Sequence, residues 1–218
     1  MATSPVSPVS ARMAMNAAVL VLSFGLGLIV LDTSVRTESR LRASDGFWRT
    51  LAFERVESEW YKSIERMFHG AELVVTGRMT EVRNSRTYGT AADAAVVRLA
   101  VIDVRIEHAY KGSLDGAESI QLEVTLPAGA SASWLDSNID TSPAIFFLRS
   151  KGTEARSLGW SEALAAVEDR YFRLVSSQGL IRLIDGVAYP PIDAEDAFLI
   201  AVTGRSLEFV ERQMTSAE

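Results

Sequence analysis

Few side chains in this sequence have the type and spacing to support chemistry. The chain contains two histidines, His69 and His108, and no cysteine, so thiolate metal ligands, disulfides and cysteine nucleophiles are excluded. A zinc site would need carboxylates converging on these imidazoles, and Glu72 and Glu107 are the nearest in sequence. His108 falls on the apolar side of its predicted strand near the strand's end, a position more typical of a sheet rim than of a ligand cluster.

Asp136, Asn138 and Asp140 copy the opening of a calcium-binding loop. Positions six and twelve of such a loop require Gly and a bidentate Glu, and here they are Thr141 and Phe147. The three polar residues are therefore the only calcium candidates, and a water-facing acidic loop is the interpretation that fits better. We predict no metal site from them.

Motifs of hydrolases and nucleotide-binding proteins are missing. A Ser-His-Asp triad has no Gly-x-Ser-x-Gly elbow to support it. Gly25 and Gly27 lie inside an apolar run, where small residues favour helix packing over phosphate binding. The sequence therefore predicts no catalytic residue and no cofactor.

Trp134 and Leu135 form an apolar pair in a loop expected after Pro127, among small and polar residues. Such a pair either folds back onto the core or is presented to a partner, so both are candidate partner-binding residues. A nucleic-acid partner is not expected, because 22 basic and 28 acidic residues leave a net charge of −6, which repels phosphate backbones.

Residues 13–31 form an apolar run interrupted only by Asn16 and Ser23. At about 1.5 Å per residue, a helix of this length reaches about 28 Å, close to the hydrocarbon thickness of a bilayer. Because no Ala-x-Ala cleavage site follows, we predict an uncleaved transmembrane anchor, with a cleaved signal peptide and a buried core helix as alternatives. The preceding residues 1–12 are predicted to be a disordered tail.

Beyond the anchor, hydrophobic periodicity predicts strands with flanking helices. The expected strands are 71–83, 95–113, 119–126, 144–149, 170–176 and a hairpin at 180–189 that turns at Asp185-Gly186. A turn-rich connection is expected at 84–93. Helical spacing predicts helices over 47–68 and 161–169, then one that Gly204 ends and one that Ser206 caps.

This pattern is typical of a mainly β, α+β fold: a small antiparallel OB-like barrel with flanking helices. The predicted organisation is a tail at 1–12, the anchor at 13–31, a juxtamembrane segment with an amphipathic helix at 32–68, the barrel at 69–190 and C-terminal helices at 191–218.

The order of these signatures resembles a netrin-like module, the OB-type barrel shared with tissue inhibitors of metalloproteinases and with exported bacterial proteins. The resemblance covers roughly residues 60–190, and its carriers are residues 71–78, Val104 with Ile106, Tyr110-Lys111-Gly112, and the strand at 144–148. Inhibitors of this fold use an N-terminal cysteine to reach zinc, and this chain has none. The resemblance therefore implies a fold, and no inhibitory activity.

Membrane sidedness has two opposed indications. Arg12 alone precedes the span, and several arginines follow it, which favours a cytoplasmic domain. The resemblance implies a domain outside the cytoplasm, which is the orientation we expect. The arginines after the span are Arg36, Arg40, Arg42 and Arg49.

Taken together, the sequence predicts a single-pass, membrane-anchored, non-enzymatic interaction module with a protein or envelope partner. One alternative is a membrane-anchored hydrolase or metal-dependent enzyme with acidic residues at the barrel mouth. Another is a single-pass subunit of a larger membrane complex, assembled through Gly25 and Gly27.

Overall fold

The computed structural model describes residues 46–52, 59–88, 96–127, 129–191 and 197–216. These all belong to one compact unit, residues 44–218. The tail predicted at 1–12 and the anchor predicted at 13–31 lie outside the described residues. In the part of the chain that is described, no helix is long and apolar enough to cross a membrane.

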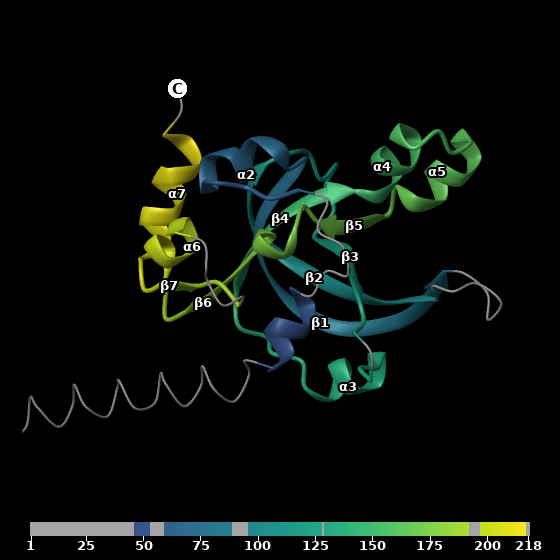
Figure 1. Cartoon of the computed structure of the whole chain (residues 1–218), viewed down its shortest axis with the longest axis horizontal. Helices are drawn as coiled ribbons and strands as arrows, with labels where there is room; N and C mark the ends of the chain where they lie inside the picture. Colours follow the sequence, from purple (N-terminus) through teal and green to yellow (C-terminus); the bar gives the residue numbers. More distant parts are fainter. Residues whose placement is uncertain (1–45, 53–58, 89–95, 128, 192–196, 217–218) are drawn as a thin grey trace, which may run out of the picture. The chain divides into compact units, whose positions relative to one another are not determined.

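The described unit has a mixed α+β fold built on one seven-stranded sheet (Figure 1). The strands are β1 (Leu73–Tyr88), β2 (Val97–Lys111), β3 (Ser119–Thr125), β4 (Ala144–Ser150), β5 (Tyr171–Leu174), β6 (Leu180–Ile184) and β7 (Val187–Tyr189). The helices are α2 (Ile64–Gly70), α3 (Ala132–Ser137), α4 (Lys151–Ser157), α5 (Glu162–Glu168), α6 (Ala197–Val202) and α7 (Leu207–Thr215), with a 3-10 turn η1 (Ser177–Gly179).

The strand order is β1-β2-β3-β5-β4-β6-β7, and β1 additionally pairs with β4. The pairings of the first five strands therefore return to their starting strand. Every pair in the sheet is antiparallel except β3 with β5, which is parallel. The predicted antiparallel arrangement holds for every other pair, and this one pair departs from it, because the α4–α5 segment carries the chain across from β4 and brings β5 alongside β3.

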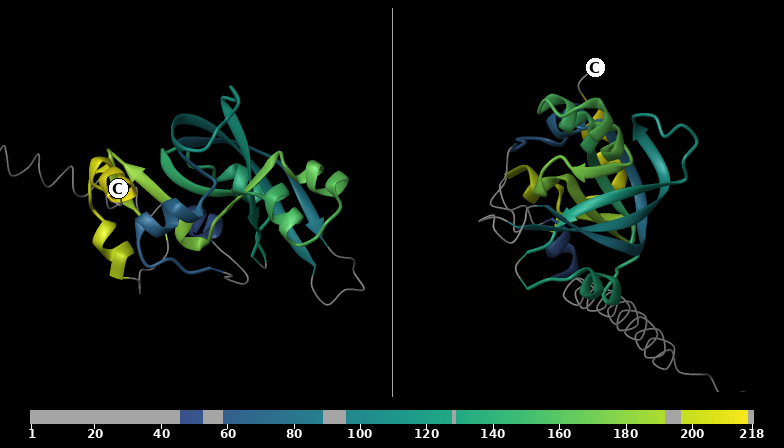
Figure 2. Two further views of the ribbon diagram at one scale, coloured as in Figure 1. Left: turned by 90° about the horizontal axis from the view of Figure 1, so that it is seen from above. Right: turned by 90° about the vertical axis from the view of Figure 1, so that its right-hand side faces the viewer.

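Two apolar clusters lie on the two sides of the strands. β4 belongs to both, since Phe146 and Leu148 join one cluster and Ile145 and Phe147 join the other. This double burial explains the continuous apolar run at 144–148 and confirms it as a central strand, which pairs with β1, β5 and β6. Figure 2 shows α2, α6 and α7 at one end of the sheet and the α4–α5 hairpin at the other.

The helix predicted over 47–68 is interrupted, which corrects the sequence interpretation. Residues 46–51 are helical, residues 59–63 are not, and α2 begins at Ile64 after the N-cap Ser63. The two helical pieces serve different clusters: Trp48 and Leu51 pack into the first, and Ile64 and Met67 into the second. One straight helix could not bury its apolar stripe in both.

Strand β1 continues to Tyr88, through a segment for which the sequence predicted a turn. It is held there by pairing with β2, for example Ser85 with Ala100. Register shifts along the β1–β2 pair, between Met79 and Glu81 and between Val82 and Asn84, interrupt the period-two pattern that reveals a strand in sequence.

The other local signals had mixed outcomes. The hairpin turn at Asp185-Gly186 is confirmed, with φ values of 51° and 77°, and Ser206 caps α7 by accepting from the Phe209 amide. The helix predicted at 161–169 is confirmed as α5. Helix α4 was not predicted, and α3 occupies part of the expected loop after Pro127.

Candidate functional site

A buried polar site lies where the start of α4 and the end of α5 meet the outer side of β3. Glu123 alternates with the core-facing residues of β3, so its side chain lies on the outer side of the strand, yet only 1% of that side chain is exposed. Glu168, at the end of α5, is 7% exposed. Two buried carboxylates need cations close by, because an uncompensated buried charge is costly.

Arg86 and Lys151 provide those cations. Arg86, near the end of β1, contacts Glu123 through Nη1. Its Nη2 lies 2.6 Å from Glu168 Oε1. Lys151, the first residue of α4, contacts the second oxygen of Glu123, and its Nζ lies 3.6 Å from Glu168 Oε2. The guanidinium of Arg86 also lies 4.3 Å from the ring centroid of Tyr171.

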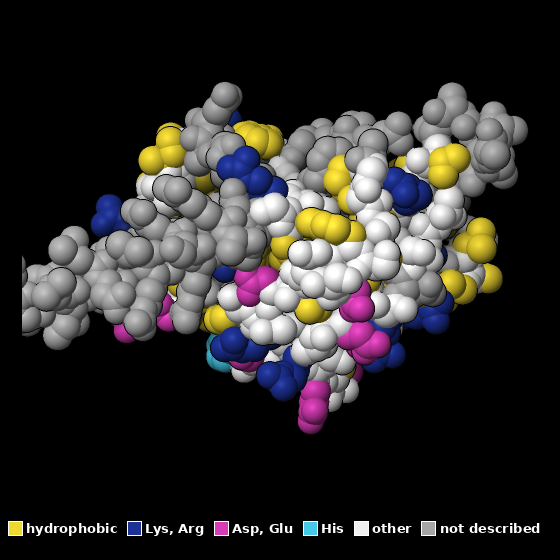
Figure 3. Space-filling view, turned by 90° about the horizontal axis from the view of Figure 1, so that it is seen from below, with side chains coloured by type: hydrophobic (Ala, Val, Ile, Leu, Met, Phe, Trp, Pro, Cys, Tyr) yellow, Lys and Arg dark blue, Asp and Glu magenta, His cyan; other side chains and the backbone are white. Residues whose placement is uncertain are grey.

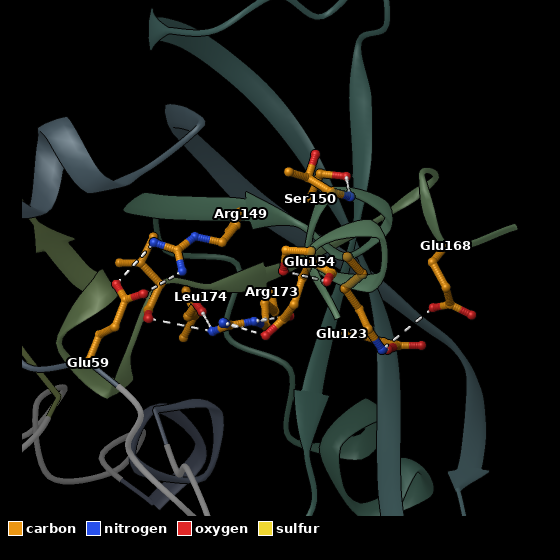
Figure 4. Close-up of polar contacts among 12 residues, drawn as sticks. Glu59, Glu123, Arg149, Ser150, Glu154, Glu168, Arg173 and Leu174 are labelled. Carbon is orange, nitrogen blue, oxygen red and sulfur yellow. Dashed lines mark hydrogen bonds and ion pairs between the residues drawn. The ribbon is translucent and has the colours of Figure 1, made fainter. Parts of the chain in front are cut away.

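These four residues, Arg86, Glu123, Lys151 and Glu168, are called the ionic quartet below. Its two positive and two negative charges sum to zero. Each carboxylate contacts both cations, so neither is available as a base or nucleophile. The arrangement is typical of a network that holds β1, β3, α4 and α5 together. Figure 4 shows Glu123 and Glu168 at one side of a larger set of polar contacts.

A second set of ion pairs involves arginines of the neighbouring strands β4 and β5 (Figure 4). Arg173 on β5 donates from Nε to Glu154 on α4 at 2.6 Å. Arg149 on β4 makes a bidentate contact with Glu59 at 2.6 and 3.0 Å. The hydrogen bond from Arg149 holds the pKa of Glu59 below its ordinary value, and burial together with the bond to Glu59 raises the pKa of Tyr61 to about 12.

The α4–α5 hairpin, residues 151–168, is closed by Arg156. Its guanidinium donates to Glu162 at 2.7 Å and to both oxygens of Asp169 at 2.7 Å. These hydrogen bonds lower the pKa of both carboxyl groups. Gly152 allows the two helices to approach, because a Cβ there would lie 2.8 Å from the carbonyl oxygen of Ala165.

An apolar groove of about 510 Å³ opens beside the ionic quartet. It is lined by Val97, Leu99, Ala155, Leu158 and Trp160, with Lys151, Glu154 and Glu168 along one side. Leu158 and Trp160 are 69% and 44% exposed, and on α5 Leu164 and Val167 are 58% and 49% exposed. Four of the large hydrophobic side chains exposed on the described residues therefore belong to this one hairpin and its turn, and they form an exposed apolar patch beside the groove.

The calcium candidates are engaged in hydrogen bonds within the fold, those of Asp136 and Asp140 reaching distant segments and that of Asn138 local. Asp136 accepts from the Val82 amide at 3.3 Å, and Asn138 donates to the Trp134 carbonyl. Asp140 Oδ2 accepts from Trp48 Nε1 and from Arg182 Nη2, each at 2.8 Å.

Burial alone would raise the pKa of Asp140, but hydrogen bonds from Ser142 and Trp48, with the charge of Arg182, outweigh it and lower that pKa. The described residues contain no group of three His, Asp or Glu side chains arranged to hold a metal ion.

Trp134 and Leu135 point in different directions from α3. Leu135 is completely buried in the first apolar cluster, and Trp134 is 40% exposed. Each residue of the pair therefore follows one of the two alternatives: Leu135 folds back onto the core, and Trp134 faces solvent.

The two histidines are exposed and lie apart from the ionic quartet. His69 is in the last turn of α2. His108 packs edge-on against Tyr110, with ring centroids 4.5 Å apart. His108 is exposed near the end of β2, and its same-side neighbours Ile106 and Tyr110 are partly buried against the apolar clusters. The acidic residues nearest in sequence to the two histidines have other partners. Glu107 pairs with Arg78, and Glu72 accepts a hydrogen bond from the Ser150 amide.

Sequence reasoning did not find the ionic quartet. Glu123 was visible only as one polar position in an alternating strand, and Arg86 lies in the segment predicted to be a turn. No spacing rule links residues 82 positions apart, as Arg86 and Glu168 are. Comparisons with family models and with curated proteins find no match to this chain.

Proposed function

We propose that this chain is a membrane-anchored, non-enzymatic interaction module that presents an OB-like, netrin-like barrel outside the cytoplasm and binds a protein or envelope partner through the α4–α5 hairpin. The observation that carries the proposal is the apolar groove beside Leu158 and Trp160, bordered by side chains whose charges are already neutralised within the chain.

The barrel part of the proposal is supported by the strand pairings. An OB-type barrel has five strands, and the pairings β1-β2-β3-β5-β4-β1 form a circuit of five. The aliphatic residues facing one cluster, among them Leu73, Val104 and Leu122, would fill the interior of such a barrel. A filled interior leaves the loops and outer side as the places where a partner can bind.

The anchor part of the proposal is supported by residues 13–31 alone, whose apolar length matches a bilayer. Alkaline carbonate extraction of membranes from cells producing the full chain tests it. We expect the chain to remain in the membrane pellet; release into the supernatant would overturn the anchor. A reporter fused after Glu218, active on only one side of the membrane, tests the orientation.

The interaction surface is tested by site-specific photocrosslinking of the full chain in cells. A photoreactive amino acid replaces Leu164 on the hairpin, and in a matched control it replaces Gln213, which is exposed on α7. We expect a discrete adduct from position 164 and none from 213. Trp160→Ser in the position-164 background should reduce the adduct at least fivefold, and an adduct that is absent or unchanged would overturn the surface.

A further inference from the structure

We infer that the α4–α5 hairpin docks against the same hairpin of a second copy of this chain and forms a two-fold symmetric dimer. This inference rests on the proposed function, because it names the partner that the hairpin surface binds. Three properties of the hairpin lead to it: its self-complementary surface, its internal charge pairing and its place in a chain proposed to be confined to a membrane.

The hairpin surface is self-complementary. It offers a groove lined by Val97, Leu99 and Ala155 and, on the neighbouring helix, the projecting apolar side chains Leu164 and Val167. Glu168 borders the groove, and Leu164 lies one helical turn before it on α5. The exposed side chains of Leu164 and Val167 therefore lie next to the groove. A two-fold interface uses one patch twice, and this requires a projection and a hollow on the same surface.

Charge favours contact between copies at this surface. The chain carries a net charge of −6, which opposes association through most of its surface. Within residues 151–169, by contrast, every charged side chain has an ion partner in its own chain. The pairs are Lys151 with Glu123 and Glu168, Glu154 with Arg173, and Arg156 with Glu162 and Asp169.

Two such hairpins can therefore meet without unpaired like charges facing each other. Figure 3, which views the molecule from below, shows hydrophobic side chains beside basic ones at its right-hand end. Neutral apolar contact of this kind resembles the centre of a homodimer interface, which is depleted of unpaired charge.

Membrane anchoring makes a small surface sufficient. Chains held in one bilayer meet at a higher effective concentration than chains free in solution, so a modest apolar contact can produce a dimer. A soluble partner gains less from this confinement. The second copy is therefore the occupant that the proposed anchor and the hairpin surface together favour.

The absence of cysteine from the sequence provides a direct test. The full chain is prepared in mild detergent with a single cysteine at Leu158→Cys, Leu164→Cys or Val167→Cys, all at exposed positions, and Gln213→Cys is the control. After mild oxidation, disulfide-linked dimer is measured on non-reducing gels. We expect at least one hairpin position to give tenfold more dimer than position 213.

A second variant separates specific docking from random collision. Leu164→Glu in the Val167→Cys chain places two like charges in the interface, and we expect at least a tenfold loss of dimer. Hairpin cysteines that cross-link no better than position 213, or a yield that Leu164→Glu leaves unchanged, would overturn the dimer.

Thiol labelling distinguishes the other occupants. If the cysteine at position 164 is protected from a water-soluble maleimide in vesicles and no dimer forms, the hairpin lies in the bilayer and the dimer is overturned. A photocrosslinked adduct to a different protein likewise overturns the dimer and leaves the proposed interaction module standing. Carbonate extraction tests the anchor separately.

Discussion

Arg86 Nη2 lies 2.6 Å from Glu168 Oε1 and joins the end of β1 to the end of α5. The same guanidinium contacts Glu123 on β3. One side chain thus connects three elements at the edge of the apolar groove, and we expect the position of the α4–α5 hairpin to depend on it. The quartet is a means of holding the hairpin surface in place.

Removing Arg86 should destabilise the fold strongly. Arg86→Met keeps the aliphatic stem but takes from the buried carboxylates of Glu123 and Glu168 one of the two cations of the ionic quartet. Breaking a buried ion pair from one side costs about 3–5 kcal/mol in free energy of unfolding. Urea unfolding followed by circular dichroism measures the loss. Arg78→Met is the control, because it removes an exposed ion pair with Glu107 and should lower the free energy of unfolding by less than about 1 kcal/mol. Equal losses in the two variants would contradict a buried quartet.

Glu59 should make the fold sensitive to acid. Its pKa is held below the ordinary 4.5, chiefly by the hydrogen bond from Arg149. A carboxyl group whose pKa is lower in the folded than in the unfolded chain stabilises the fold above its unfolded pKa. That stabilisation disappears as pH falls through the folded value.

In Arg149→Met the pKa of Glu59 should rise toward 4.5, and this contribution to the acid dependence should diminish. Carbon-detected NMR titration of the Glu59 carboxyl measures the shift. An unchanged pKa would mean that Arg149 is not its main cause.

Gly152 should be intolerant of a side chain. Its Cβ position lies 2.8 Å from the Ala165 carbonyl oxygen and nearer still to the Asp169 carboxylate, so Gly152→Ala forces α4 and α5 apart. Overpacking of this kind costs about 1–3 kcal/mol. Thermal unfolding measures it. Gly46→Ala is the matched control, because nothing lies within 4 Å of the added methyl group there, and it should leave stability unchanged or slightly raised.

The two neighbours on α3 should respond differently to truncation. Leu135→Ala removes a completely buried side chain and should lower the free energy of unfolding by about 2–5 kcal/mol. Trp134→Ala removes a side chain that is 40% exposed and should cost less. Chemical denaturation of both variants is the measurement. A larger loss at Trp134 would show that the Trp134 ring, and not the Leu135 side chain, supports the core.

The sequence by itself determined several of the local elements. Alternating aliphatic residues at Ile120, Leu122 and Val124 require a strand with one dry face, Asp185-Gly186 requires a tight turn, and Ser206 begins the last helix. Each of these depends on residues a few positions apart, which interact through backbone geometry and local hydrogen bonds. They were predictable for that reason.

Only the tertiary structure decided which residues distant in the sequence come into contact. The sheet brought Arg86 to Glu123 and Glu168, divided the predicted helix at 47–68 between two apolar clusters, and made β5 parallel to β3. These relationships depend on pairings between distant segments, and Coulomb attraction and burial act on distance in space. In the sequence, a glutamate on the solvent-exposed side of a strand looks the same as one buried in an ionic quartet. The sequence alone could therefore not show that Glu123 belongs to the candidate site.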